Sequence, residues 1–240
     1  MIISVHLPKT AGSSFKASLH QNFDHKLLLD YEDLPLNTPV FERNKNVFTS
    51  GLINAERDFG ETECIHGHFM PAKYLLLNSI KPLKFVTWMR HPVDRVISHY
   101  YFWQRRYNPD APPLHKRIVE EKWSLEKFCL SDEMKNIYQQ FLWGFPIWNF
   151  DFIGITEYYE ADFKYFSDCF FNKKVDLFNE NINPNSKGGY AISKSFRKQI
   201  ESFHAEDMEL YERANRLRLQ RDQRLSTRIN RIVKKKLGFS

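Results

Sequence analysis

The sequence predicts an α/β protein of P-loop-like architecture, with three layers, α/β/α, around a central and mostly parallel sheet. Short runs of apolar and β-branched residues recur along the chain, as buried strands do. Segments with apolar residues at helical spacing separate these runs, and this alternation is typical of parallel sheets. The chain has 240 residues, of which 42% are hydrophobic, so it can form one large domain with a substantial core.

The first strand and the first helix are expected within residues 2–23. Residues 2–7 read IISVHL, a short apolar run that predicts a buried strand. Residues 12–23 are expected to form a helix, because large apolar side chains recur there at helical spacing: Phe15, Leu19 and Phe23. Ser13 or Ser14 can cap or begin this helix.

Three more strands and one helix are expected in the middle of the chain. Residues 25–31 and 61–69 predict strands, and residues 83–89, LKFVTWM, predict the strongest strand of the sequence. Residues 32–46 hold two prolines and polar clusters, so a loop is expected there. A helix is expected over 71–80, because it opens with a proline.

The second half of the chain is expected to be mostly helical around one last strand. Pro92 opens a helix with a clear apolar face: Val93, Val96, Ile97 and Tyr100. Residues 107–150 are aromatic and helix-like, apart from a proline-rich loop. A strand at 150–155 follows, and the remaining elements are a helix at 160–171, a polar loop at 179–190 and a helix at 192–217 that Ser193 can cap.

Charge and cysteine content exclude some classes of protein. Residues 213–236 hold ten Lys or Arg and one Asp, so their net charge is +9. The whole chain carries +6, so the remaining residues carry −3. We therefore expect no general nucleic-acid binder. Three widely spaced cysteines do not form a disulfide framework. The N-terminus lacks a signal-peptide pattern and no long apolar run exists, so a cytoplasmic protein is expected.

The stretch HLPKTAGSSF, residues 6–15, is the first candidate site. A strand that ends in a tight loop before a helix directs backbone N–H groups and the positive end of the helix dipole at one point, where an anion can bind. The loop adds a lysine, a glycine and hydroxyl groups: Lys9, Thr10, Ala11, Gly12, Ser13 and Ser14. The alternative is a capped helix with a solvent-exposed lysine. A triphosphate-binding loop is disfavoured, because the order G-x-x-x-x-G-K-[ST] is missing.

A second anion-binding group is expected at the end of strand 83–89. Arg90 follows this strand, and Ser98 lies eight residues later on the helix that Pro92 opens. Ligands of open α/β sheets bind outside the carboxyl ends of the strands. A ligand with two separated anionic groups would therefore bridge Lys9 and Arg90. The alternative for Arg90 is a structural ion pair with Asp94.

These two motifs resemble those of sulfotransferases that use 3′-phosphoadenosine 5′-phosphosulfate (PAPS). LPKTAGSS resembles the family's 5′-phosphosulfate loop, and RHPVDRVISHYY resembles its 3′-phosphate motif. The sequence is most similar to the carbohydrate branch, which includes heparan sulfate 2-O-sulfotransferase and bacterial relatives. FDFIGITEYYEADF and HAEDMELYERA resemble connecting segments of that branch, so the resemblance covers most of residues 2–215.

The resemblance implies a role for each matching residue. Lys9 would contact the phosphosulfate, with Thr10 to Ser14 around it, and Arg90 and Ser98 would hold the 3′-phosphate. PAPS would be the only co-substrate, and no metal is implied. His91 departs from the family's usual aspartate, which bears on how the motif arginine is oriented. The loop at 179–190 lies where relatives close over the nucleotide, and Lys187 could assist there.

The stretch CIHGHF supplies the candidate general base. Histidine titrates near neutrality, and it can accept the proton of an attacking hydroxyl. The resemblance to the 2-O branch favours His68 as this base, with His66 as the alternative. Two other interpretations remain: a structural histidine, or half of a zinc site, because Cys64, His66 and His68 recur at the period of a strand.

The resemblance implies transfer of a sulfuryl group from PAPS to a hydroxyl of a carbohydrate or glycolipid. Residues 1–216 would form the sulfotransferase domain, and 107–150 could contribute to the acceptor side. Arg105 and Arg106 could hold an acidic sugar or simply form a solvated helix end. The aromatic residues of this segment could stack on sugar faces, but ordinary core packing is the preferred interpretation. Residues 217–240 predict a basic amphipathic helix, which could contact a membrane surface, a second subunit or a glycan, or simply pack on the domain. The alternatives are a non-catalytic nucleotide- or glycan-binding relative and a phosphoryl transferase.

Overall fold

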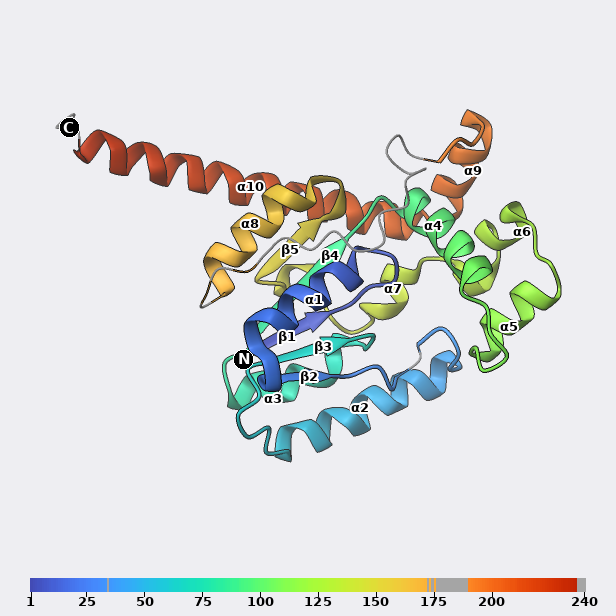
Figure 1. The fold of residues 1–240 in the computed structure, drawn as a ribbon, viewed down its shortest axis with the longest axis horizontal. Helices are drawn as coiled ribbons and strands as arrows, with labels where there is room; N and C mark the ends of the chain where they lie inside the picture. Colours follow the sequence, from blue (N-terminus) through green and yellow to red (C-terminus); the bar gives the residue numbers. More distant parts are fainter. Residues whose placement is uncertain (34, 172, 174, 176–189, 237–240) are drawn as a thin grey trace.

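Five parallel strands form the central sheet of this computed structural model, in the order β2-β3-β1-β4-β5 (Figure 1). The structure describes residues 1–33, 35–171, 173, 175 and 190–236, and side chains as far as residue 224. The strands are β1 (Ile2–Val5), β2 (Leu27–Leu29), β3 (Cys64–Gly67), β4 (Lys84–Met89) and β5 (Phe152–Ile155). Every predicted strand is present, and the predicted α/β class with a parallel sheet is confirmed.

Alternate residues of the strands face two apolar layers. One layer lies under α1 (Gly12–Phe23) and α8 (Tyr159–Phe170) and consists of Ile2, Phe15, Leu19, Phe23, Cys64, Val86, Trp88, Phe152, Phe163 and Phe166. The opposite, larger layer is built on the intervening strand residues and is covered by η2 (Pro71–Tyr74), α3 (Leu75–Ile80) and α7 (Ile137–Phe141). Helices on both faces of a parallel sheet give the predicted three-layer architecture.

Helix α2 (Val40–Glu56) corrects the prediction of a loop over 32–46. Pro39 directly precedes the helix, a position where proline is tolerated, and does not lie inside it. The buried side of the helix is mostly polar or small: Arg43, Val47, Gly51 and Asn54. Large apolar residues such as Phe41 and Phe48 face solvent instead. The helix therefore lacks the apolar face toward the core on which the sequence prediction relied.

Several helices surround the end of the sheet at which the strands terminate (Figure 1). Helix α4 (Pro92–Arg105) begins at Pro92 as predicted. The aromatic segment 107–150 is helical as expected, in short pieces: α5 (Pro113–Glu120), α6 (Leu125–Cys129), η3 (Asp132–Met134), α7 and η4 (Ile147–Asn149). Two further 3-10 turns lie elsewhere in the chain: η1 (Asp24–Lys26) precedes β2, and η5 (Thr156–Tyr158) follows β5.

The predicted helix at 192–217 is two helices, α9 (Lys194–Phe203) and α10 (Ala205–Lys236). Ser193 caps α9, since its hydroxyl accepts a hydrogen bond from the Phe196 N–H at 3.1 Å. His204 separates the two helices and is fully buried; its Nε2 hydrogen-bonds the Cys129 carbonyl at 2.8 Å. This tertiary contact, which local sequence does not reveal, explains why the helical pattern is interrupted.

Helix α10 runs past residue 216, the predicted end of the domain, and its far end projects away from the body of the molecule (Figure 1). Arg218 Nε lies 2.9 and 3.0 Å from the two carboxylate oxygens of buried Asp162, and Arg221 pairs with the same carboxylate. The residues just after 216 therefore pack on the domain. The division at 216 stays a prediction, and the side chains of Leu225, Ile229, Ile232 and Val233 lie outside the described residues. Among the described helices, none is both long and apolar enough to cross a bilayer.

Candidate functional site

The loop between β1 and α1 has an unusual backbone. Lys9 and Ala11 both adopt left-handed conformations, with φ of 66° and 63°. Side-chain-bearing residues rarely adopt this region, and such strain is concentrated at functional sites. Ala11 is the residue before α1 and gives the helix no side-chain cap. The first turn of α1 thus presents its N–H groups and its positive dipole end to the loop, which is the geometry of an anion site.

The hydroxyl groups of the loop do not all face this site. The Thr10 hydroxyl donates a hydrogen bond to the Leu7 carbonyl at 2.8 Å and is buried, so it stabilises the turn itself. Ser14 is also buried, whereas Ser13 is exposed. Ser13 is therefore the loop hydroxyl best able to reach a bound anion from solvent.

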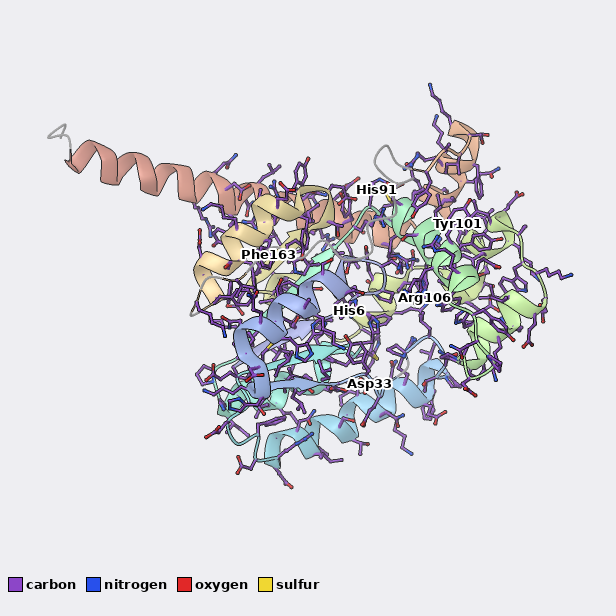
Figure 2. The ribbon with its side chains drawn as sticks, viewed as in Figure 1. His6, Asp33, His91, Tyr101, Arg106 and Phe163 are labelled. Atoms are coloured by element: carbon purple, nitrogen blue, oxygen red, sulfur yellow. The ribbon has the colours of Figure 1, made fainter. Side chains whose placement is uncertain are left out.

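Gly12 serves a purpose that the sequence did not reveal. Its backbone does not require a positive φ, but a Cβ atom at this position would overlap the imidazole ring of His6. The glycine thus lets a histidine ring lie directly against the first turn of α1. His6 lies at the carboxyl end of β1, near the middle of the view in Figure 2.

Lys9 belongs to a cluster of cations. Its ammonium lies 3.7 Å from the centre of the Phe102 ring, a cation–π contact with helix α4. Burial, together with the positive charges of Arg90, Arg105 and Arg106, lowers the pKa of Lys9 to about 8. Within the described part of the chain, none of these four cations forms an ion pair with a carboxylate. Positive charges gathered without counterions favour binding of an anion.

The alternative role for Arg90, an ion pair with Asp94, is wrong. Asp94 instead binds Arg197 at 3.1 Å and lies 4.0 Å from His91. Among the residues that the structure describes, the Arg90 guanidinium has only a loose contact with the ring of Tyr190, at 5.9 Å. His91 does not hold Arg90 either; its N–H donates to Glu157 at 2.7 Å. The Arg90 side chain is therefore available to a ligand.

Ser98 lies on the buried side of α4, with 8% of its surface exposed. Arg90 lies at the end of β4, just before that helix begins. Both are thus on the β4–α4 unit, beside the β1–α1 unit that carries Lys9, because β1 and β4 are neighbours in the sheet. Each of the two predicted anion-binding motifs lies at a strand end, as expected, and the strand order makes these ends neighbours. Tyr101, on α4, and Arg106, just after it, lie on the same side of His6 in Figure 2.

Three histidine rings are packed together at the ends of β1 and β3. The His6 ring stacks on His68 at 4.0 Å and on His66 at 5.1 Å between centroids. The Tyr31 hydroxyl lies 3.1 Å from His6 Nδ1. Burial lowers the pKa of all three histidines, and the neighbouring rings and Lys9 act in the same direction on His6. These rings are therefore neutral at pH 7.

His68 has the tautomer that a general base requires. Its Nδ1 lies 2.5 Å from the His6 carbonyl oxygen, so Nδ1 carries the proton and donates it. The Nε2 atom then has a free lone pair. Burial lowers the pKa of His68 to about 4, although the bond to His6 favours the protonated form. The ring is only partly buried and can meet a substrate.

His66 lies deeper than His68. It is 1% exposed, and its Nδ1 hydrogen-bonds the Ser4 hydroxyl at 2.8 Å. Its Nε2 is buried without a partner. Burial also raises the pKa of the Cys64 thiol, which disfavours a thiolate ligand. In the part of the chain that the structure describes, no three His, Cys, Asp or Glu residues are placed to hold a metal ion.

Sequence reasoning missed two residues of this site. His6 was within the quoted loop, at a strand end, where ligands of such sheets bind; that rule could have identified it. Tyr31 follows β2 and has no local signal. Its neighbours Asp30 and Asp33 bind the buried ammonium of Lys73 at 2.7 and 2.8 Å, and this fixes the segment beside the histidines. Lys187 lies outside the described residues.

Known proteins similar to this chain come from the solved structures. No protein-family profile matches the chain, and no curated protein matches it. Among the solved structures that match is mouse sulfotransferase SULT7A1 in complex with PAP, at 11% sequence identity and a TM-score of 0.35. The match covers 86% of this chain and 65% of the mouse protein, so this chain spans less than two thirds of it.

Proposed function

We propose that the protein is a PAPS-dependent sulfotransferase that transfers a sulfuryl group to a hydroxyl of a carbohydrate or glycoconjugate. One observation carries the proposal. Four cations that have no carboxylate partner among the described residues gather beside a helix N-terminus without a side-chain cap and a neutral histidine with a free Nε2. Such an arrangement suits an anionic donor and an acceptor that must lose a proton. The sequence motifs at both strand ends support the same donor.

In the proposed reaction the acceptor oxygen attacks the sulfur of PAPS in line with the bond that breaks. His68 Nε2 accepts the acceptor's proton, so the histidine becomes a cation. The bond between sulfur and the bridging phosphate oxygen breaks, and the negative charge gathers on that oxygen. Lys9 and the N–H groups of α1 stabilise this charge, and groups placed in this way are worth about 3–4 kcal/mol each.

The two phosphate sites have separate proposed roles. Lys9, the loop residues 10–14 and the start of α1 would hold the 5′-phosphosulfate. Arg90 and Ser98 would hold the 3′-phosphate. Each motif lies at the end of its own strand, so one nucleotide with two anionic ends can bridge them.

An acidic acceptor fits the charge of the site. Arg105 and Arg106 are exposed at the end of α4 and lie near enough to Lys9 to lower its pKa. Most aromatic residues of segment 107–150, such as Trp123 and Phe128, are buried in the core and cannot stack on a sugar. Trp148 is 67% exposed, but it directly precedes β5 and so lies at the amino ends of the strands, away from Lys9 and Arg90.

Nucleotide binding tests the donor assignment. Calorimetry without Mg²⁺ should show that adenosine 3′,5′-bisphosphate binds more tightly than ATP. Tighter binding of ATP would refute the sulfotransferase proposal and favour a phosphoryl transferase. A screen with labelled PAPS across sugars, glycolipids and phenols would then separate an enzyme from a non-catalytic nucleotide-binding relative, because only the enzyme transfers label.

The basic end of α10 is proposed to contact an anionic membrane surface. Sedimentation with vesicles rich in phosphatidylserine should bring down the full chain but not a chain that ends at residue 224. The shortened chain keeps Arg218 and Arg221, which pair with buried Asp162, so its fold is preserved. Equal sedimentation of the two chains would rule out membrane contact through the tail.

A further inference from the structure

The main chain of Arg90 is held by a buried phenol from a distant helix. Tyr138, on α7, is fully buried. Its hydroxyl accepts a hydrogen bond from the Arg90 N–H at 2.9 Å and donates one to the Arg90 carbonyl at 2.7 Å. One side chain thus satisfies both main-chain polar groups of one residue. Arg90 lies between the end of β4 and the start of α4, where neither strand nor helix supplies these partners.

Helix α7 is in turn held by the beginning of α10. It has five residues, too few to be stable alone. The two carboxylate oxygens of Asp207 accept hydrogen bonds from the N–H groups of Tyr138 and Gln139, each at 3.1 Å. His204 Nδ1 accepts from the Asn136 N–H at 3.2 Å. The start of α7 is therefore capped by two side chains, those of Asp207 on α10 and of His204, the residue before α10.

A buried cation of the phosphate motif faces this cap. Arg95, on α4, is fully buried, and its guanidinium lies 5.6 Å from the Tyr138 ring centre. Burial raises the pKa of Asp207 to about 6, while the charge of Arg95 acts to lower it. Arg95 thus connects the phosphate motif to Tyr138, and Asp207 and His204 connect α7 to the start of α10.

We propose that Tyr138 is a positioning residue that fixes the Arg90 main chain so that its guanidinium meets the 3′-phosphate of the nucleotide. The inference rests on the proposed function. Among the described residues, the Arg90 side chain has one loose ring contact, with Tyr190. Its direction before ligand binding therefore depends on the main chain from which it projects. Tyr138 holds that main chain on both sides of the Arg90 Cα.

The substitution Tyr138→Phe removes both hydrogen bonds and keeps the ring, so the core stays filled. Titration with two nucleotides isolates the effect. Affinity for adenosine 3′,5′-bisphosphate should fall about tenfold, as expected for two lost hydrogen bonds that orient a charged contact. Affinity for adenosine 5′-phosphosulfate, which lacks the 3′-phosphate, should stay within about twofold of the wild type. A general loss of structure would weaken both nucleotides.

The matched control is Tyr74→Phe. Tyr74 is also buried, and its hydroxyl also donates a hydrogen bond, to the Asp30 carboxylate at 2.7 Å, but it lies on η2 and outside the phosphate motif. This variant should bind both nucleotides as the wild type does. Amide hydrogen exchange without nucleotide gives a second readout, since the Arg90 N–H should exchange faster in Tyr138→Phe and not in Tyr74→Phe.

The outcomes separate this inference from the proposed function. If wild type prefers the 3′,5′-bisphosphate and Tyr138→Phe keeps that preference, the positioning role is overturned and the sulfotransferase proposal stands. If wild type shows no preference for a 3′-phosphate, both are overturned. If the Arg90 amide hydrogen exchanges at the wild-type rate in Tyr138→Phe, the Tyr138 hydroxyl does not hold the Arg90 main chain and the inference fails.

Discussion

The charge on Lys9 should control the pH dependence of nucleotide binding. Burial and three nearby arginines lower the pKa of this lysine from 10.5 to about 8. That shift corresponds to about 3 kcal/mol of unfavourable surroundings for the ammonium. A bound phosphate would relieve them, so the complex keeps Lys9 charged. The free protein loses that charge as the pH rises through 8.

The size of the effect follows from this single proton. The dissociation constant of adenosine 3′,5′-bisphosphate should double at pH 8 relative to pH 7, rise about tenfold by pH 9 and continue tenfold per unit. A lysine with an ordinary pKa would change the constant by less than about 10% at pH 9. Calorimetry or fluorescence titration from pH 7 to 9.5 at constant ionic strength measures the difference.

The control is Lys9→Arg. A guanidinium stays charged throughout this range, so the variant should bind with a constant affinity between pH 7 and 9.5. A wild-type affinity that is flat to pH 9.5 would refute the assignment of a shifted lysine to the phosphate site. An equal decline in Lys9→Arg would show that another group titrates.

Three further predictions follow from single contacts. His68→Asn should lower kcat by about 10²–10⁴-fold and leave nucleotide affinity unchanged. The wild-type rate should not fall as the pH drops through 6.5, because the pKa of His68 is about 4. A fall in rate near pH 6.5 would contradict the tautomer and burial described above. Gly12→Ala should destabilise the protein by about 1–3 kcal/mol in urea unfolding, and adding His6→Ala should restore most of the loss; no rescue would show that the ring is not the obstacle. Arg218→Ala should lower the free energy of unfolding by about 3 kcal/mol, because it removes one partner of buried Asp162, and an unchanged urea midpoint would mean that the pair contributes nothing.

The fold class was predictable because the strands are short, apolar and continuous. Residues of a parallel sheet are buried on both faces, so their sequence signal is local. The β4 run and the opening of α4 by Pro92 are of this kind, and the structure has both. Helix α2 was missed because its buried side is mostly polar or small, and the break before α10 was missed because a distant carbonyl holds His204.

Sequence alone also predicted two anion-binding motifs, since Lys9 and Arg90 each follow a predicted strand and strand ends meet at one edge of a parallel sheet. Their adjacency depends on the strand order, in which β1 and β4 are neighbours. Only the tertiary structure placed His6 against Gly12 and stacked it on His68. His6 and His68 are 62 positions apart in the chain, and the pKa values follow from burial that no local pattern encodes. The sequence therefore determined which groups could bind an anion, and the packing of the chain decided which of them are neutral, charged or held in place.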